Sequence, residues 1–165
     1  MKVALRSLKA QDRMPLERML DGILSFDPED RALAVELITI ALEQADQKDY
    51  SFILATNEED QPVGYTCYGP TPLTDGTFDL YWIAVDPQCA GQGIGTLLLK
   101  AVEEGVRSRN GRMLLIETSS SQAYERTCRF YLKKGYTLAE TIPGFYRQGE
   151  DRLTFIKCLP PDGTI

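Results

Sequence analysis

Apolar and polar residues follow two periodicities along the chain, and together these predict seven strands and four helices. Alternating positions or short continuous apolar runs predict strands at residues 2–8, 50–56, 62–69, 77–85, 112–118, 136–140 and 152–159. Apolar residues three and four positions apart predict helices at residues 12–24, 27–45, 94–110 and 121–135. The order β-α-α-β-β-β-α-β-α-β-β indicates a mixed α/β sheet with at least one parallel β-α-β unit.

Local signals set several boundaries of these elements. Asp12 and Asp27 are predicted N-caps, and Pro28 stands at the first position of its helix. The Pro- and Gly-rich stretch 70–76 is a predicted loop, and residues 142–151, between the last two predicted strands, are expected to form another. Since no repeat or linker interrupts the pattern, we expect residues 1–165 to form a single domain.

Composition narrows the function classes. The net charge of −6 and a pI near 4.8 argue against a nucleic-acid-binding protein, which needs a basic surface. The N-terminal stretch has no long apolar run, so neither a signal peptide nor a membrane anchor is expected. The four cysteines are scattered, which favours reduced thiols in a cytoplasmic protein and no metal site. Because the chain has no histidine, proton transfer must use carboxylates, tyrosine, lysine, cysteine or water.

The stretch "VDPQCAGQGIGTLLL" contains three alternate glycines, Gly91, Gly93 and Gly95, between a strand and a helix. A glycine turn at a helix N-terminus favours anion binding, because free N–H groups point outward and no Cβ blocks their approach. A tight turn without a ligand is the alternative. A P-loop would require a lysine before Thr96, and the dinucleotide fingerprint a third glycine that the spacing does not supply.

The same stretch resembles the acetyl-CoA-binding motif of the GNAT N-acetyltransferases, Q/R-x-x-G-x-G/A after a strand ending in Val-x-Pro. Gln88, Gly91 and Gly93 match it. Downstream, "YERTCRFYLKKGY" resembles the family's "N-x-x-A-x-x-F-Y-x-K-x-G-F" helix, although Tyr124 and Thr127 replace its Asn and Ala. The resemblance implies a GNAT-like acyl-CoA N-acyltransferase fold, with a mostly antiparallel mixed sheet, a splayed parallel strand pair and about four helices.

The resemblance also implies which residues meet acetyl-CoA, the donor substrate. Backbone amides of the glycine turn would bind the pyrophosphate, and the N–H of Val85 would polarise the thioester carbonyl. The full set of implied acetyl-CoA contacts is Ile83, Val85, Gln88, Ala90, Gly91, Gln92, Gly93, Ile94, Gly95, Thr96, Tyr124 and Tyr131. No metal ligand is implied.

Three residues are candidates for proton transfer. Tyr131 is the acid for the departing thiolate by resemblance, although helical spacing alone also fits an aromatic core stripe with Tyr124 and Cys128. Strand alternation places Asp79 on one face with Val85, six residues apart, where several family members carry a glutamate base. An exposed strand-end carboxylate is the alternative for Asp79. Glu117 is the second candidate base, and water could also accept the amine proton.

The resemblance therefore implies an N-acetyltransferase in which a primary amine attacks acetyl-CoA directly in a ternary complex. The acceptor would lie against the first two helices and the loop 142–151, where Phe145, Tyr146 and Arg147 are candidate contacts. The amine is not identified by the sequence. The alternative function is a non-catalytic acyl-CoA-binding or regulatory module on the same fold, and a homodimer is possible because the family often forms one.

Overall fold

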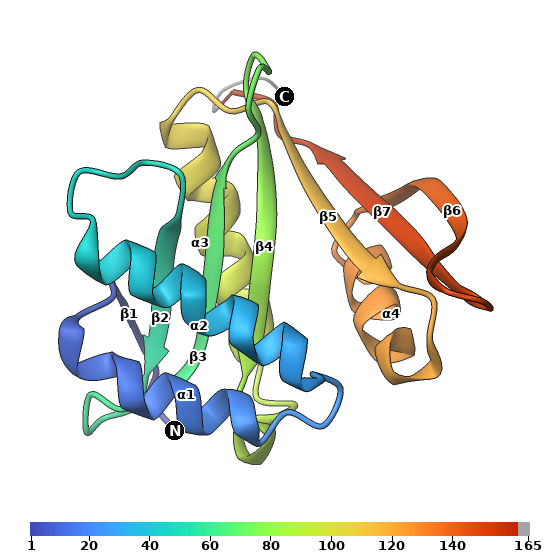
Figure 1. The fold of residues 1–165 in the computed structure, drawn as a ribbon. Helices are drawn as coiled ribbons and strands as arrows, with labels where there is room; N and C mark the ends of the chain where they lie inside the picture. Colours follow the sequence, from blue (N-terminus) through green and yellow to red (C-terminus); the bar gives the residue numbers. More distant parts are fainter. Residues whose placement is uncertain (162–165) are drawn as a thin grey trace. The chain divides into compact units, whose positions relative to one another are not determined.

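The computed structural model describes residues 1–161 and contains the predicted order of elements (Figure 1). The strands are β1 (Ala4–Arg6), β2 (Ser51–Thr56), β3 (Pro62–Pro70), β4 (Thr77–Val85), β5 (Met113–Ser119), β6 (Thr137–Arg147) and β7 (Glu150–Cys158). The α-helices are α1 (Arg13–Asp21), α2 (Pro28–Glu43), α3 (Ile94–Ser108) and α4 (Glu125–Lys133). Among residues 1–161, no helix has both the length and the apolar character needed to cross a membrane.

The strands form a mixed sheet in the order β1-β2-β3-β4-β5-β7-β6. β4 and β5 run parallel, with Thr77 opposite Met113 and Leu80 opposite Ile116. The helix α3 connects these two strands, so they form the predicted parallel β-α-β unit. This confirms the expected architecture, a mostly antiparallel mixed sheet with one parallel pair and four α-helices in the described chain.

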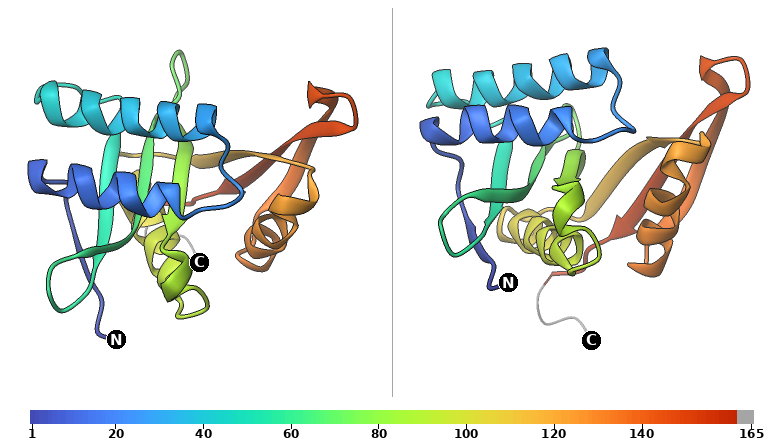
Figure 2. Two further views of the ribbon diagram at one scale, coloured as in Figure 1. Left: turned by 60° about the horizontal axis from the view of Figure 1, so that its bottom comes forward. Right: turned by 90° about the horizontal axis from the view of Figure 1, so that it is seen from below.

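The chain divides into two compact units. Unit 1 comprises Met1–Gly69 and Tyr81–Glu104, and unit 2 comprises Pro70–Leu80 and Gly105–Ile165, of which residues 105–161 are described. In unit 1, α1 and α2 lie side by side over one face of the strands, and α3 lies on the other face (Figure 2).

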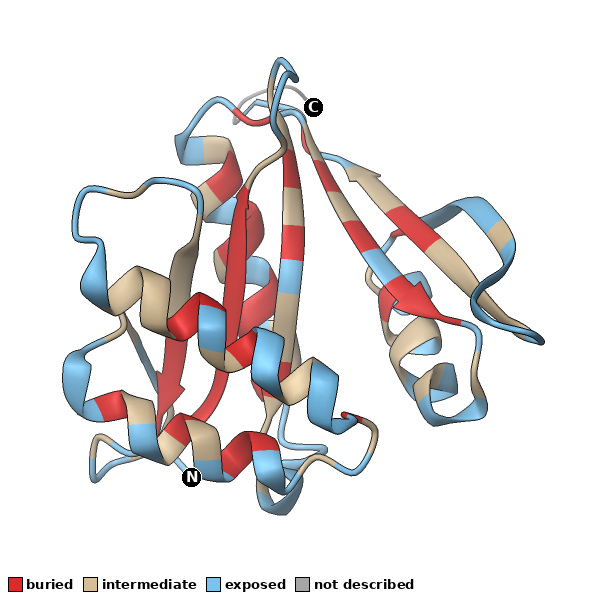
Figure 3. Ribbon diagram, in the orientation of Figure 1, coloured by how far each residue is buried: buried red, intermediate tan, exposed pale blue. Residues whose placement is uncertain are grey.

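The core of unit 1 has two layers, one on each face of its strands. Leu16, Leu20 and Ile38 of α1 and α2 are fully buried. They pack with Leu54, Tyr65 and Ala84 of the strands. On the α3 side, Ile94 and Leu98 pack against Ala55 and Val63. β3 is buried along almost its whole length (Figure 3), because both of its faces are covered by helices.

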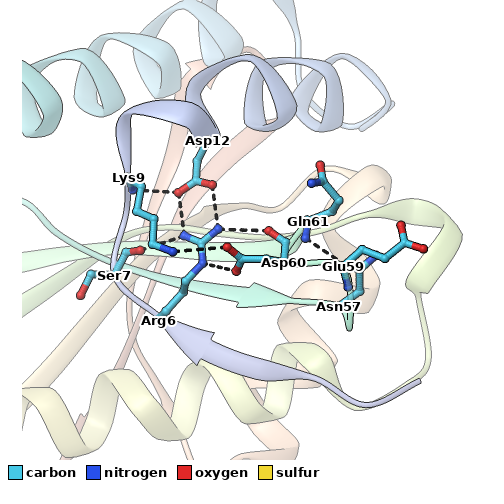
Figure 4. Close-up of polar contacts among 8 residues, drawn as sticks. All are labelled: Arg6, Ser7, Lys9, Asp12, Asn57, Glu59, Asp60 and Gln61. Atoms are coloured by element: carbon cyan, nitrogen blue, oxygen red, sulfur yellow. Dashed lines mark hydrogen bonds and ion pairs between the residues drawn. The ribbon is translucent and has the colours of Figure 1, made fainter.

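A buried ion pair ties the first strand to the first helix in unit 1 (Figure 4). Arg6 donates from both terminal nitrogens to the carboxylate of Asp12, at 2.7 and 2.8 Å, and from Nε to Asp60 at 2.5 Å. Asp12 stands at the predicted N-cap of α1, but its carboxylate makes no capping bond to that helix. It accepts instead from Arg6 and from the N–H of Lys9 at 2.8 Å, so the carboxylate bonds to residues that precede α1 rather than to the first turn of that helix.

The helix α4, the residue before β6 and the strand β7 contribute an aromatic core in unit 2. The ring of Tyr131 lies 5.8 Å from that of Phe155 and 5.9 Å from that of Tyr136, centroid to centroid. All three residues are buried. Lys157 donates to the carbonyl of Lys134 at 3.0 Å, which fastens the C-terminal end of α4 to β7.

The predicted loop 142–151 is wrong, because most of it belongs to a β-hairpin. β6 continues to Arg147, and β7 already begins at Glu150. Pro143 and Gly144 are tolerated because the register between the two strands shifts between Ile142 and Arg147. The predicted helix 121–135 begins as a 3-10 turn at Gln122–Tyr124 before α4 starts.

Candidate active site

The glycine turn lies entirely in unit 1 and is open to solvent. Gly91 and Gly93 have φ values of +80° and +81°, a conformation that residues with a Cβ rarely adopt. A Cβ built on either glycine meets no atom of residues 1–161 within 4 Å. The glycines are thus required by the backbone conformation rather than by crowding, and the space above them is free. The exposed residues of the turn are Gln88, Ala90, Gly91, Gln92 and Gly93.

The turn leads directly into α3 and leaves its first amides available. The first intrahelical bond runs from the N–H of Leu97 to the carbonyl of Gly93 at 3.0 Å. The N–H groups of Ile94, Gly95 and Thr96 precede that bond and have no partner within the helix. The side chain of Ile94 is buried, so this residue can offer a ligand only its backbone. The helix N-terminus adds a favourable field for an anion.

Packing fixes the position of this N-terminus against the strands of unit 1. Ile94 and Leu98 share a cluster with Ile83 and Val85 of β4. A Cβ on Gly64 would stand 3.1 Å from the side chains of Ile94 and Leu98, so glycine at that position allows β3 and α3 to approach closely. The carboxylate of Asp86 accepts from the N–H of Gln88 at 2.8 Å and orders the chain before the turn.

Tyr131 lies in unit 2, buried on the side of β7 that carries Phe155. Burial raises the pKa of its phenol, and the neighbouring Cys128 thiol raises it further. The phenol is therefore neutral at physiological pH and holds a proton. Cys128 donates weakly from Sγ to the carbonyl of Ser119, at 3.9 Å, and burial raises its pKa as well. A raised pKa disfavours the thiolate, so Cys128 fits a packed thiol better than a nucleophile.

Tyr124 is half-buried at the N-cap of α4, and its N–H donates to the carbonyl of Ser121 at 3.0 Å. The same short segment leads to Tyr131 two turns later. The two tyrosines predicted to contact acetyl-CoA are thus carried by one continuous piece of unit 2.

Asp79 and Glu117 lie on the same face of the sheet of unit 2. Asp79 is opposite Leu115, and Leu115 and Glu117 are two residues apart on β5, so their side chains share one side. Glu117 is opposite Thr154, whereas the neighbouring Phe155 points to the other side with Tyr131. The two candidate bases and the candidate acid therefore lie on opposite faces of these strands.

The two carboxylates have different surroundings. Asp79 is half-buried, and its Oδ2 accepts from the hydroxyl of Thr71 at 2.7 Å. Glu117 is 47% exposed, and its Oε1 lies 3.6 Å from Nη1 of Arg152. Asp79 therefore already has a hydrogen-bond donor, while Glu117 has an ion-pair partner beyond ordinary hydrogen-bond length.

The predicted acceptor contacts lie on the hairpin arm of unit 2. Phe145 and Tyr146 are exposed large side chains, and their rings meet edge to face at 5.0 Å. Arg147 pairs with Glu150 at 2.9 Å while remaining 70% exposed. The free carboxylate-binding guanidinium predicted from sequence is therefore already engaged by a carboxylate of its own hairpin.

The residue that the sequence did not single out is Arg152, in β7. It contacts Glu117 of β5, Glu140 of β6 and the ring of Phe145. Alternation along β7 could have placed Arg152 and Thr154 on one face, but the register of three strands is needed to bring Glu117 and Glu140 to them.

Comparison with known proteins gives consistent matches. The profile of the acetyltransferase (GNAT) domain matches residues 48–138. A crystal structure of a GNAT-family acetyltransferase from Desulfovibrio desulfuricans is 38% identical with a TM-score of 0.92, covering 96% of this chain and 100% of that one. An uncharacterised N-acetyltransferase of Methanocaldococcus jannaschii is 37% identical over 79 residues, 47% of this chain. The match spans about half (49%) of that relative.

A more distant structure shows the same fold. It is an aminoglycoside 6'-N-acetyltransferase complexed with coenzyme A, with 18% identity and a TM-score of 0.75 over 98% of this chain and 99% of that chain.

Proposed function

The chain belongs to the GNAT acetyltransferase family, and we propose that it transfers the acetyl group of acetyl-CoA to a primary amine. The observation that carries this proposal is the solvent-open glycine turn Gly91–Gly93, with positive φ values and the unpartnered first amides of α3 behind it. That arrangement suits the pyrophosphate of coenzyme A, which the distant aminoglycoside acetyltransferase structure contains.

Unit 1 supplies the donor-binding groups in this proposal. The amides from Gly91 to Thr96 receive the pyrophosphate, and Gln88 and Gln92 stand exposed beside them. Ile83 and Val85 hold the strand against α3, so the backbone of Val85 has a fixed position. Its N–H is the proposed donor to the thioester oxygen, which gains negative charge as the amine attacks.

The reaction proposed is a direct attack within a ternary complex. The amine nitrogen forms a bond to the thioester carbonyl carbon, and the carbon–sulfur bond breaks as the tetrahedral intermediate collapses. The proton lost by the amine passes to a carboxylate or water, and the departing thiolate takes a proton from an acid. Products are an N-acetylated amine and free coenzyme A, so no covalent acetyl-enzyme is required.

Unit 2 supplies the proton-transfer groups. Tyr131 is the proposed acid because it matches the tyrosine of the family's helix motif and its phenol carries a proton, while burial, which raises its pKa, makes it a weaker acid than an exposed tyrosine. Asp79 and Glu117 are the proposed bases, directly or through water, and both lie on the face opposite Tyr131.

The test incubates the full chain with acetyl-CoA and a panel of primary amines: an α-amino acid, a polyamine, an aminoglycoside and an unblocked peptide. Coenzyme A release and acetylated amine are both measured by chromatography, and binding is followed by thermal shift. We expect stabilisation by acetyl-CoA and acetylation of at least one amine. Stabilisation without transfer to any amine supports the non-catalytic acyl-CoA-binding module, and no stabilisation at all contradicts both functions.

A further inference from the structure

Arg152 links three strands on the face of unit 2 that carries the candidate bases. Its Nη2 donates to Oε2 of Glu140 at 3.2 Å, and its Nη1 lies 3.6 Å from Oε1 of Glu117. Its guanidinium carbon lies 4.7 Å from the centre of the Phe145 ring. We call this group, Glu117, Glu140, Phe145 and Arg152, the Arg152 cluster.

The two carboxylates of the Arg152 cluster differ in the number and length of their hydrogen bonds and ion pairs. Glu140 accepts a hydrogen bond from Arg152 and a longer one, 3.5 Å, from the hydroxyl of Thr154. Among residues 1–161, Glu117 has only the 3.6 Å ion pair, which restrains its carboxylate without occupying it as a hydrogen-bond acceptor. Since Glu117 is also about half exposed, its oxygens stay available to an incoming amine.

Arg152 itself is shielded from solvent. Its side chain is 21% exposed, and its Nε is buried without a hydrogen-bond partner among residues 1–161. A buried donor without a partner is unfavourable. The contacts of the guanidinium with Glu117, Glu140 and the ring of Phe145 must offset that cost to hold Arg152 in this position. Because its guanidinium is shielded and already contacts two carboxylates, Arg152 is suited to orient Glu117 and Glu140 rather than to bind a ligand.

We infer that Arg152 is a positioning residue that holds Glu117 in place to receive the proton of the acceptor amine. The inference rests on the proposed function and makes Glu117, rather than Asp79, the base of that reaction. Arg152 fixes Glu117 from β7, while Glu140 keeps Arg152 itself in place from β6. The register of the three strands thus sets the location of the base.

A double-mutant cycle tests this inference. The variants are Arg152→Gln, Glu117→Gln and the double variant, assayed with the panel amine that the wild-type full chain acetylates fastest. We expect Glu117→Gln to lower kcat/KM for the amine by about 100-fold, the lower end of a general-base contribution. Arg152→Gln should lower it by about tenfold through misplacement of that base, with KM for acetyl-CoA unchanged.

The cycle is decided by the double variant. If Arg152 acts through Glu117, the double variant is no less active than Glu117→Gln alone. Arg152→Lys retains the charge and should recover part of the loss, which a purely structural role would not predict. Lys9→Gln is the matched control, since it removes an exposed ion pair with Asp60, away from the proposed acceptor and donor sites, and should leave the kinetics unchanged.

Several outcomes overturn the inference while the proposed function stands. These are full activity in Arg152→Gln, an undiminished tenfold loss on the Glu117→Gln background, or no recovery in Arg152→Lys. If Arg152→Gln does not fold, as judged by circular dichroism, the cycle is run with Arg152→Lys, where any loss must again vanish on the Glu117→Gln background. A wild-type chain that acetylates no amine contradicts the proposed function and this inference together.

Discussion

The two compact units present their functional groups in different ways. Unit 1 offers backbone amides from one continuous stretch, Gln88 to Thr96, whose shape depends on two glycines with positive φ. Unit 2 offers side chains from β4, β5, β6, β7 and α4, and strand register decides which of the strand residues share a face. A binding site formed by one continuous stretch of backbone can be recognised as a sequence motif. A site formed by side chains that are far apart in the sequence cannot.

The cores of the two units differ in a related way. Unit 1 buries mainly aliphatic side chains between helices and strands, with Leu16, Leu20 and Ile38 fully enclosed. Unit 2 packs the rings of Tyr131, Tyr136 and Phe155 together, so its proposed acid is itself part of the core. Changes at Tyr131 therefore need variants that keep the ring in place.

The largest effect is expected from Tyr131→Phe. Removing the hydroxyl while keeping the ring should lower kcat by about 100-fold or more, because the thiolate then leaves without an acid. KM for acetyl-CoA should change little. The matched control is Tyr136→Phe, a second buried tyrosine of the same aromatic core, which should leave kcat unchanged. Equal turnover in Tyr131→Phe and wild type would remove Tyr131 as the acid.

Asp12→Asn in unit 1 is expected to lower stability strongly without weakening the binding of acetyl-CoA. Breaking the buried pair with Arg6 should lower the free energy of unfolding by about 3 kcal/mol, measured by urea denaturation. Binding of acetyl-CoA to the folded variant should be unchanged. A stability loss below about 0.5 kcal/mol would show that the pair contributes no more than a surface ion pair.

The same pair predicts how stability depends on pH. Burial alone would raise the pKa of Asp12, but hydrogen bonds from Arg6 and Lys9 outweigh it and hold the pKa below its usual value. Stability from a lowered carboxyl pKa is present above the unfolded value, about 3.9, and is lost as the pH falls below it. Urea unfolding between pH 6 and pH 3, run as a series, should therefore show a steeper acid loss in wild type than in Asp12→Asn. Parallel curves would contradict this assignment.

A smaller effect is expected from Gly93→Ala in the glycine turn. A Cβ at φ +81° strains the backbone by about 1–2 kcal/mol and enters the space proposed for the pyrophosphate, so acetyl-CoA should bind about tenfold more weakly. Gly149→Ala is the control, since its φ is +83° and its Cβ also meets nothing within 4 Å. Equal acetyl-CoA affinity in both variants, measured by calorimetry, would argue against the turn as the donor site.

The smallest effect is expected from Arg13→Gln. Its exposed ion pair with Glu17 at i,i+4 should contribute about 0.3–0.5 kcal/mol, so the melting temperature should barely move. A loss of unfolding free energy as large as that of Asp12→Asn would mean that the exposed and the buried ion pairs of unit 1 contribute equally to stability.

The sequence predicted the element order, the parallel unit and the glycine turn, because each depends on local periodicity or on glycine conformation. It failed at residues 142–151, where Pro143 and Gly144 suggest a loop, yet cross-strand pairing continues through an irregular register to Arg147. It placed Asp12 correctly at the N-cap position of α1, but the carboxylate makes no capping bond to that helix and instead accepts from Arg6, six residues earlier.

The candidate bases show the same limit. Asp79 and Glu117 were identifiable from the strand pattern and the resemblance, but the hydroxyl of Thr71 on one and Arg152 near the other were not. Such contacts depend on which residues face each other across strands, and single-residue shifts in register would replace every partner.

Acetyl transfer by direct attack is tested with acetyl-CoA that carries a deuterated acetyl group, followed by mass spectrometry of the amine and the protein from one reaction. Direct attack predicts the labelled acetyl group on the amine, one free coenzyme A for each acetyl transferred, and an unmodified protein. Label on a cysteine that then passes to the amine would contradict direct attack. Label on neither, with the protein stabilised by acetyl-CoA, would contradict acetyl transfer itself.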